Sequence, residues 1–545
     1  MRNTYKHLLL AVVLVALFLS ACGTATTVAP TTAQVTAKPT DIPLTPTPTE
    51  IQPAEISLWA AGRVSEADDP PDDWVVYDIL KEKLKITLDL VVMKGGNDDM
   101  NQKINTAAAA NDLPDLFFVN RDAWFALVGQ DMIAQVDDLL PLMPTRTETH
   151  YNDPNRNRLV TIDGKMYGLP DPGQIPTTDG LVIRKDWLDK LGLAMPKTLD
   201  ELIAVAKAFT ENDPDGNGKN DTYGFGGYPE MAGVPENGLG RRFDYIMGAF
   251  GVSGMWNVTQ DGFGMNVYNP NFLEALKVFR QINVEGLITP DWPTLKKDDF
   301  RAKWKQGQWG IMRENFAALS TKSNYKDFDA NNPTGEWVVL PPPTGPTGLS
   351  SEGLSNQSAR IYAVSQKAID EGKGEAIARF LEWTAQDEGY YLLGFGQKGV
   401  NYDLDANGYI TLEGIAKEQQ WTAKETQPLT QLANMVYIFS DVELKARYPE
   451  HQTANGRTIK PLDFLAGFTA QKWTECTASG IINPPDNWGD LQTRYNEGIQ
   501  AFVLDVDNEI TQEAWDAFLA DLESMGTKDW IAAARDILTG AGYLK

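Results

Sequence analysis

Short apolar runs alternate with amphipathic stretches from Glu55 onward. Residues 56–59, 86–92 and 116–119 have the length and apolar content of buried strands, while residues 74–84 and 97–110 show the spacing of helices. This alternation predicts an α/β fold in which helices flank a parallel or mixed sheet. Ligands of such sheets bind beyond the carboxyl ends of the strands, which directs attention to Trp59 and to residues 120–124.

The same alternation starts again near Gly180. Residues 181–183 form a predicted strand, and the helix predicted over 186–191 ends at Gly192. Thr198 and Glu201 have the spacing of a capping box at the start of a further amphipathic helix. A helix is also predicted over 376–393. A chain of this length is too long for one core, so we expect two lobes.

The N-terminus differs from the rest of the chain. Arg2 and Lys6 precede an apolar run over 8–19, and Ser20-Ala21-Cys22 follows it. This pattern predicts a lipoprotein signal peptide over 1–21, with Cys22 lipidated as the new N-terminus. An ordinary secretory cleavage site and an uncleaved anchor are the alternatives. Residues 22–54 are rich in Thr and Pro, which predicts an extended tether to the globular part.

Charge and cysteine content narrow the function classes. The formal net charge is −26, and removal of residues 1–21 would make it −28, because Arg2 and Lys6 are lost with no acid. Such a surface repels nucleic acid and anionic lipid headgroups. If Cys22 is lipidated, Cys476 has no disulfide partner, and we expect it to be a buried, unreactive thiol.

Several motifs together resemble one family. They are the Asp163-Gly164-Lys165-Met166-Tyr167-Gly168-Leu169-Pro170 block, the stretch from Leu181 through Leu193, Pro196 through Leu202, Gly286-Leu287-Ile288, Lys305 through Met312, Ala359 through Val364, and Gly394-Phe395-Gly396. In this order they resemble the family 1 extracellular solute-binding proteins, most closely their long lipoprotein branch.

This resemblance implies a two-lobed clamshell in which each lobe is a mixed sheet flanked by helices and is discontinuous in sequence. Lobe one is expected over 55–172 and 352–403, and lobe two over 173–351 and 404–545. Hinge closure on a carbohydrate, followed by recognition by an ABC transporter permease, is the implied function.

An Asp-rich loop predicts a cation site. Asp213, Asp215, Asn217 and Asp221 fill positions 1, 3, 5 and 9 of an EF-hand-like loop, and the carbonyl of Lys219 would supply position 7. Calcium suits this all-oxygen set. Position 12 is Gly224, which has no carboxylate. The loop is similar to that of alginate-binding members of the family, but Thr222 stands where they have a carboxylate, and a metal-free Asx-rich turn is the alternative.

Two further motifs are expected to be structural. Asn407-Gly408, inside the Asp403–Gly408 stretch, has the sequence of a hairpin turn. Gly394, Gly396 and Gly399 match a dinucleotide-binding spacing, but they follow a helix rather than a strand, so we expect a helix C-terminus and loop.

Sugar sites combine flat aromatic rings with Asp, Asn and Arg side chains. On position alone, the candidate ligand-binding residues are Trp59, Arg121, Trp124, Asp171, Tyr228, Arg242, Trp256, Arg313 and Asn315. Trp187 and Trp383 occupy apolar helical positions and are expected to pack in cores.

The sequence therefore predicts a monomeric, lipid-anchored carbohydrate-binding subunit of an ABC importer on the outer face of the membrane, with calcium and no organic cofactor. It predicts no catalysis, because His150 and His451 are the only histidines after the leader and neither HExxH nor GxSxG occurs. A secreted glycoside hydrolase and a non-catalytic surface glycan-binding protein are the alternatives.

Overall fold

The computed structural model describes residues 51–545, apart from residues 65, 96, 171–176, 231–236, 260–261, 356–359 and 476. From Gln52 onward the chain forms one compact unit. The leader, Cys22, the tether, Asp171 and Cys476 lie outside the described residues, so the predictions for them stay predictions. Within the described part, none of the helices has the length and apolar content needed to cross a membrane.

The first sheet has the strand order β2-β1-β3-β13-β6. Its strands are β1 (Ala54–Ala61), β2 (Ile86–Met93), β3 (Leu116–Asn120), β6 (Leu169–Pro170) and β13 (Arg360–Val364). β1 pairs in parallel with β2 and β3, whereas β13 runs antiparallel to β3 and β6. β13 joins this sheet from about 240 residues further along the chain than β3, so this lobe is discontinuous in sequence.

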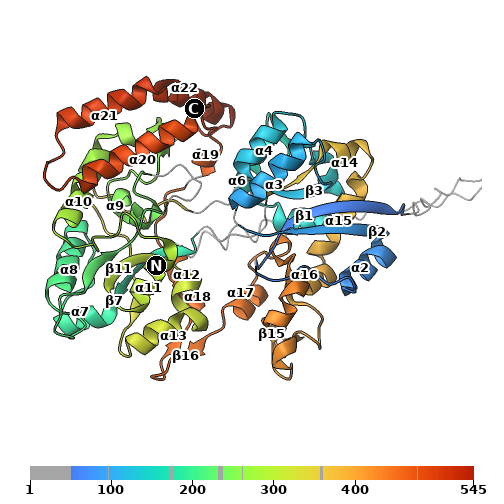
Figure 1. Cartoon of the computed structure of the whole chain (residues 1–545), viewed down its shortest axis with the longest axis horizontal. Helices are drawn as coiled ribbons and strands as arrows, with labels where there is room; N and C mark the ends of the chain where they lie inside the picture. The colour runs from blue at the N-terminus through green and yellow to red at the C-terminus, as the bar shows by residue number, and fades with distance from the viewer. Residues whose placement is uncertain are drawn as a thin grey trace, which may run out of the picture. The chain divides into compact units, whose positions relative to one another are not determined.

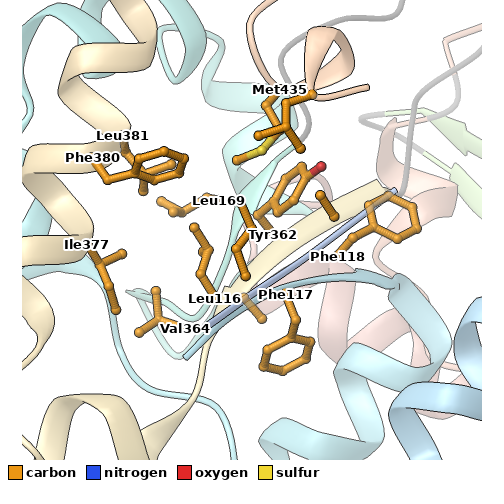
Figure 2. Packing of buried hydrophobic residues seen from close by; sticks show 14 of the residues in the cluster. Leu116, Phe117, Phe118, Leu169, Tyr362, Val364, Ile377, Phe380, Leu381 and Met435 are labelled. Atoms are coloured by element: carbon orange, nitrogen blue, oxygen red, sulfur yellow. The ribbon is translucent and has the colours of Figure 1, made fainter. Parts of the chain in front are cut away.

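Helices flank both faces of the first sheet. α3 and α4 lie on one side, and α15 lies on the other (Figure 1). The helices of this lobe are α2 (Val75–Ile79) with the following π-turn η1 (Leu80–Leu84), α3 (Asn97–Ala109), α4 (Arg121–Val128), α5 (Pro144–His150), α6 (Pro154–Arg158), α14 (Gln366–Asp370), α15 (Gly374–Ala385) and α16 (Asp387–Phe395). Leu116, Tyr362, Phe380 and Met435 meet in the buried core (Figure 2).

The first core includes more of the chain than the sequence predicted. We placed residues 404–545 in lobe two, but Trp421, Leu432, Met435 and Tyr437 pack in the same cluster as β1 and β3. These side chains surround the aromatic end of α16, where Phe395 contacts Trp421 edge-on at 5.1 Å between ring centroids. The packing therefore favours a return to lobe two after Tyr437, and the exact lobe limits remain a proposal.

The second sheet has the order β12-β7-β11-β8. Its strands are β7 (Asp179–Arg184), β8 (Tyr223–Gly226), β11 (Trp309–Asn315) and β12 (Trp337–Val339). Successive residues of β7 alternate between two buried clusters: Leu181 and Ile183 join one, and Val182 joins the other. Both faces of this sheet are thus covered. Gly180 must lack a side chain, because a Cβ there would lie 2.1 Å from the ring of Phe468 in α18 (Pro461–Thr469).

The remaining described helices lie outside the set that flanks the first sheet. They are α7 (Lys185–Leu191), α8 (Leu199–Glu211), α9 (Asp244–Ala249), α10 (Pro270–Val284), α11 (Lys297–Lys305), α12 (Phe316–Ser320), α13 (Lys322–Asn331), α17 (Asp441–Arg447), α18 (Pro461–Thr469), α19 (Thr477–Gly480), α20 (Trp488–Leu504), α21 (Gln512–Ser524) and α22 (Thr527–Gly540). α20, α21 and α22 follow one another as a C-terminal layer beside α10 (Figure 1). The predicted two-lobed α/β class is confirmed.

Short elements complete the fold. Two-stranded ribbons are formed by β4 (Thr161–Ile162) with β5 (Lys165–Met166), β9 (Trp256–Thr259) with β10 (Gly262–Met265), β14 (Asp403–Leu404) with β15 (Ile410–Thr411), and β16 (His451–Gln452) with β17 (Thr458–Ile459). The 3-10 turns are η2 (Asp137–Leu142), η3 (Arg241–Phe243), η4 (Asn266–Tyr268), η5 (Lys417–Gln419), η6 (Lys424–Thr430) and η7 (Ala433–Met435). The hairpin predicted at Asn407-Gly408 is confirmed by the pairing of β14 with β15.

Local sequence signals predicted most helix ends correctly, but one predicted helix is wrong. The capping box at Thr198 and Glu201 forms, and Gly396 ends α16 with a φ of 83°. The single helix predicted over 376–393 is wrong, because Gln386 is extended and separates α15 from α16. Gly389 then lies so close to α15 that a Cβ would be 2.2 Å from the carbonyl oxygen of Trp383.

Candidate functional site

The carboxyl ends of β8 and β11 lie at one edge of the second sheet. These strands are parallel, with Trp309 opposite Tyr223 and Met312 opposite Gly226. β7 runs antiparallel to β11, and Asp179 at its start is paired with Asn315 at the end of β11. The edge that the strand-end rule marks for ligands therefore carries Tyr228, Arg313, Glu314, Asn315 and Asp179.

Arg242 forms the centre of a buried ionic network at this edge. It lies in η3 with only 2% of its surface exposed. Its Nε is 2.6 Å from Glu230 Oε2, and its Nη1 donates to Glu314 Oε1 at 3.2 Å. Burial lowers the pKa of Arg242, but the carboxylates of Glu314, Glu230 and Asp179 outweigh burial and raise the pKa well above its ordinary value. Arg242 is thus a permanent cation held in place.

Tyr228 provides an aromatic neighbour for Arg242. The guanidinium carbon of Arg242 is 5.3 Å from the centroid of the Tyr228 ring, which is itself 5.2 Å from the ring of Phe300. Burial raises the pKa of Tyr228 to about 12, so its hydroxyl stays protonated and can donate a hydrogen bond.

Arg313 differs from Arg242 because part of its hydrogen-bonding capacity is unused. Its Nη1 donates to the carbonyl of Arg241 at 2.6 Å, and its guanidinium carbon is 5.3 Å from the ring of Trp473. Neither Nε nor Nη2 finds an acceptor among the residues described by the structure, although the side chain is 1% exposed. Burial lowers the pKa of Arg313. A buried donor without an acceptor is costly, so these two nitrogens are suited to donate hydrogen bonds to ligand oxygens.

Two carboxyl groups near Arg313 are in opposite protonation states. Burial disfavours ionisation of Asp179, but Arg241, Arg242 and Arg313 outweigh burial and lower its pKa to about 2. Burial raises the pKa of Glu352 to about 8, against the opposing effect of Arg313. Glu352 Oε2 accepts a hydrogen bond from the backbone N–H of Leu181 at 3.1 Å. The edge thus offers a carboxylate acceptor and a neutral carboxyl donor.

We name Asp179, Tyr228, Glu230, Arg242, Arg313, Glu314 and Asn315 the strand-end group. Four of the residues predicted from sequence belong to it: Tyr228, Arg242, Arg313 and Asn315. Asn315 also caps α12, because its Oδ1 accepts from the backbone N–H of Ala317 and Ala318. Asp179, Glu230 and Glu314 were missed. The only sequence signal for Asp179 is its position two residues before the predicted strand 181–183.

The other predicted ligand residues lie elsewhere in the structure. Trp124 is fully buried and donates to the carbonyl of Tyr167 at 2.9 Å, so its ring packs in the first core. Arg121 at the start of α4 donates from Nε to the carbonyl of Leu159 at 3.3 Å. Trp256 stacks on Phe263 at 5.2 Å and is 3% exposed. Trp59 lies in β1, partly exposed. Trp187 and Trp383 are buried, as predicted.

The Asp-rich loop folds around its own side chains. Asp213 accepts from the backbone N–H of Gly216, Asn217 and Gly218, while Asn217 Nδ2 donates to Asp215 and Asp221. The hydrogen bond from Asp215 lowers the pKa of Asp213, and burial raises the pKa of Asp215. Oxygen side chains therefore converge, and a cation would relieve the repulsion between the neighbouring carboxylates.

Two positions limit the fit of this loop to calcium. Thr222 is buried and donates to the carbonyl of Phe209 at 2.9 Å, so it faces inward. Gly224 packs so tightly against Ala206 that no acidic side chain fits at that position. Within the described parts of the chain, no three His, Cys, Asp or Glu side chains are close enough to hold a metal ion. The oxygen set suits calcium, but the site is not preformed by carboxylates alone.

Comparison with known proteins gives a consistent result. Residues 75–391 match the family model described as bacterial extracellular solute-binding protein. The polygalacturonan/rhamnogalacturonan-binding protein YtcQ of Bacillus subtilis is 28% identical over 377 residues, which is 67% of this chain and 70% of that protein.

Solved structures share the fold. An HMO-binding, ABC-transporter-associated solute-binding protein from Bifidobacterium longum infantis superposes with a TM-score of 0.68 at 18% identity, covering 90% of this chain and 99% of that one. An EF-hand mutant of the substrate-binding protein FusA of Streptococcus pneumoniae, in complex with fructo-nystose, gives a TM-score of 0.61 at 20% identity, with coverage of 90% and 99%.

Proposed function

Because this chain belongs to the bacterial extracellular solute-binding proteins, we propose that it captures a mono- or oligosaccharide and delivers it to the permease subunits of an ABC transporter. The names of its relatives support a carbohydrate ligand, since YtcQ is named a polygalacturonan/rhamnogalacturonan-binding protein and FusA was solved in complex with fructo-nystose. Binding is non-catalytic in this proposal, and the protein acts as a monomer.

The unused donors of Arg313 are the observation that supports this function most directly. Sugar hydroxyls are acceptors that a buried guanidinium can bind, and each also carries a proton that Asp179 or Glu230 can accept. The hydroxyl of Tyr228, which stays protonated, adds a hydrogen-bond donor beside Arg242. The strand-end group therefore has the hydrogen-bond donors and acceptors of a carbohydrate site.

A thermal-shift screen of the purified full-length chain against a glycan library tests the proposal. A saccharide at a hundredfold excess over its Kd should stabilise the protein by about 2.7 kcal/mol. Arg313→Gln should abolish the shift, while Arg494→Gln, which alters an exposed ion pair with Asp521, should retain it. Turnover of the glycan, or an equal shift in both variants, would contradict the proposal.

Anchoring at Cys22 belongs to the same proposal. The Ser20-Ala21-Cys22 motif and the Thr/Pro-rich tether support a protein held at the outer face of the membrane by acyl chains. Metabolic labelling with a fatty acid should mark the chain, and Cys22→Ser should remove the label. An unlabelled wild-type chain would contradict the anchor.

We also propose that the Asp-rich loop binds calcium. Asp213, Asp215, Asn217, Asp221 and the carbonyl of Lys219 would hold the ion, which would brace the segment between α8 and β8. The missing carboxylate at Gly224 predicts weak affinity, in the range of about 10⁻⁴ to 10⁻³ M known for extracellular calcium sites.

A further inference from the structure

We propose that Arg63 binds the carboxylate of an acidic saccharide, so that the ligand of this protein is a sugar that contains a uronate. This inference rests on the proposed function, to which it adds a ligand class and a binding residue in the first lobe. Arg63 lies two residues after β1, at the carboxyl end of a strand that pairs in parallel with β2 and β3. Ligands of such sheets bind at this edge.

The loop that carries Arg63 is held in place by Gln431, which is fully buried. Gln431 Oε1 accepts a hydrogen bond from the backbone N–H of Val64 at 3.1 Å. Its Nε2 donates to the backbone carbonyls of Val64, Ala67 and Asp68. The backbone N–H of Arg63 in turn donates to the carbonyl of Gln431 at 3.1 Å. The backbone on both sides of Arg63 is thus fixed, which lowers the entropic cost of using its side chain to bind a ligand.

The guanidinium of Arg63 has no anionic partner. Its Nε is buried and finds no hydrogen-bond acceptor in the part of the chain that the structure describes. Burial lowers the pKa of Arg63, Tyr437 raises this pKa and Arg447 lowers it, so the groups that act on it include no carboxylate. Charged groups removed from water are normally paired, and an acidic ligand would supply the missing anion.

The two ionisable neighbours of Arg63 do not offer a negative charge. Arg447 Nη1 donates to Glu443 Oε1 at 3.0 Å, so the carboxylate of Glu443 is already used by another cation. Burial raises the pKa of Tyr437 to about 12, and its hydroxyl therefore stays neutral. The charge of Arg63 remains uncompensated.

The acids on the same loop do not neutralise Arg63 either. Asp69 pairs with Lys94 at 3.2 Å, and the side chains of Glu66 and Asp68 belong to exposed residues. None of these three acids is among the groups that act on the pKa of Arg63. Because the net charge of −26 disfavours anionic ligands over most of the surface, an uncompensated cation determines where a carboxylate can bind.

Trp421 lies beside the guanidinium. The guanidinium carbon of Arg63 is 5.8 Å from the centroid of the Trp421 ring, within the range of a cation–π contact. Trp421 is only 4% exposed, and its Nε1 also finds no acceptor among the described residues. A uronate supplies a carboxylate for a guanidinium as well as hydroxyl oxygens for further donors, whereas a neutral sugar supplies only the hydroxyls.

Isothermal titration calorimetry of the full-length chain tests this inference with two pairs of oligosaccharides. The pairs are trigalacturonate and an alginate trimer, each with its fully methyl-esterified, neutral counterpart. At least one acid should bind the wild type about ten times more tightly than its ester, because the ester cannot accept a charge-assisted hydrogen bond through a carboxylate. Arg63→Gln should lower the affinity for that acid about tenfold and leave the affinity for the ester unchanged. Arg63→Lys should keep part of the preference, because it keeps the charge but not the planar fork.

Arg535→Gln is the matched control. It removes an exposed arginine whose guanidinium carbon lies 5.5 Å from the ring of Phe263, and it should leave both affinities unchanged. Equal binding of each acid and its ester, or an equal loss for both in Arg63→Gln, would overturn the inference. Binding of neutral saccharides alone, with the same affinity in Arg63→Gln, would overturn it while leaving the proposed function standing. Failure of every saccharide to bind would contradict both.

Discussion

At the scale of single residues, the second lobe concentrates buried charge where its parallel strands end. Glu314 is fully buried and is bound by both Arg242 and Arg301. Arg242 and Arg313 could be named from the sequence because they lie near predicted strand ends. Their burial and their carboxylate partners could not, because Glu230, Glu314 and Glu352 come from segments far apart in the chain.

Glu352 makes stability depend on pH. Its folded-state pKa of about 8 lies above its ordinary value of 4.5, so the native state holds a proton that the unfolded state has lost. This stabilising contribution is complete below pH 4.5 and is lost as pH rises toward 8. Each pH unit in this window should cost up to about 1.4 kcal/mol.

Glu352→Gln mimics the protonated side chain and should remove this contribution. Urea denaturation at pH 5, 6, 7 and 8 should therefore show a shallower loss of stability in the variant than in the wild type. Parallel curves for the two proteins would show that Glu352 does not titrate in this range.

At the scale of elements, short sequence patterns correctly predicted the features that depend only on neighbouring residues. The capping box at Thr198, the hairpin at Asn407 and the C-terminus of α16 at Gly396 each depend on a few consecutive residues, and each is confirmed. The break at Gln386 depends on how α16 packs against α15. The helical spacing of apolar residues continues through this position, so the sequence predicted one helix instead of two.

The Asp-rich loop gives a prediction at this scale. Calcium should raise the melting temperature of the wild type relative to a chelator, with half saturation at roughly 10⁻⁴ to 10⁻³ M. Asp213→Asn should abolish the effect, because Asp213 organises three backbone N–H groups of the loop. Asp405→Asn, in the similar but hairpin-forming loop, should retain it. Identical melting of the wild type in calcium and in chelator would contradict the proposed ion.

At the scale of the whole molecule, the chain builds two cores from segments that alternate along the sequence. Apart from Leu159, which already packs in the second core, it passes from the first core to the second after Leu169, returns after Leu340, and leaves again after Tyr437. Cores that share several crossing segments can rotate about them as rigid bodies, which is how ligand closure occurs in two-lobed binding proteins.

Closure is measurable in solution. Small-angle X-ray scattering should show a smaller radius of gyration when a saccharide found in the thermal-shift screen is added. Arg313→Gln should remove this change at the same saccharide concentration. An unchanged radius of gyration in the wild type at saturating ligand would show that binding does not move the lobes.

The sequence by itself determined the α/β class, the two-lobed organisation, most element ends, and the oxygen set of the Asp-rich loop, because these depend on periodicity, capping and short spacings. Only the tertiary structure decided which candidates meet. It buried Trp124 and Trp256 in cores, left Trp59 partly exposed beside Lys103, and surrounded Arg242 with acids from three distant segments. Burial and long-range pairing arise from packing between elements, which no local pattern of residues encodes.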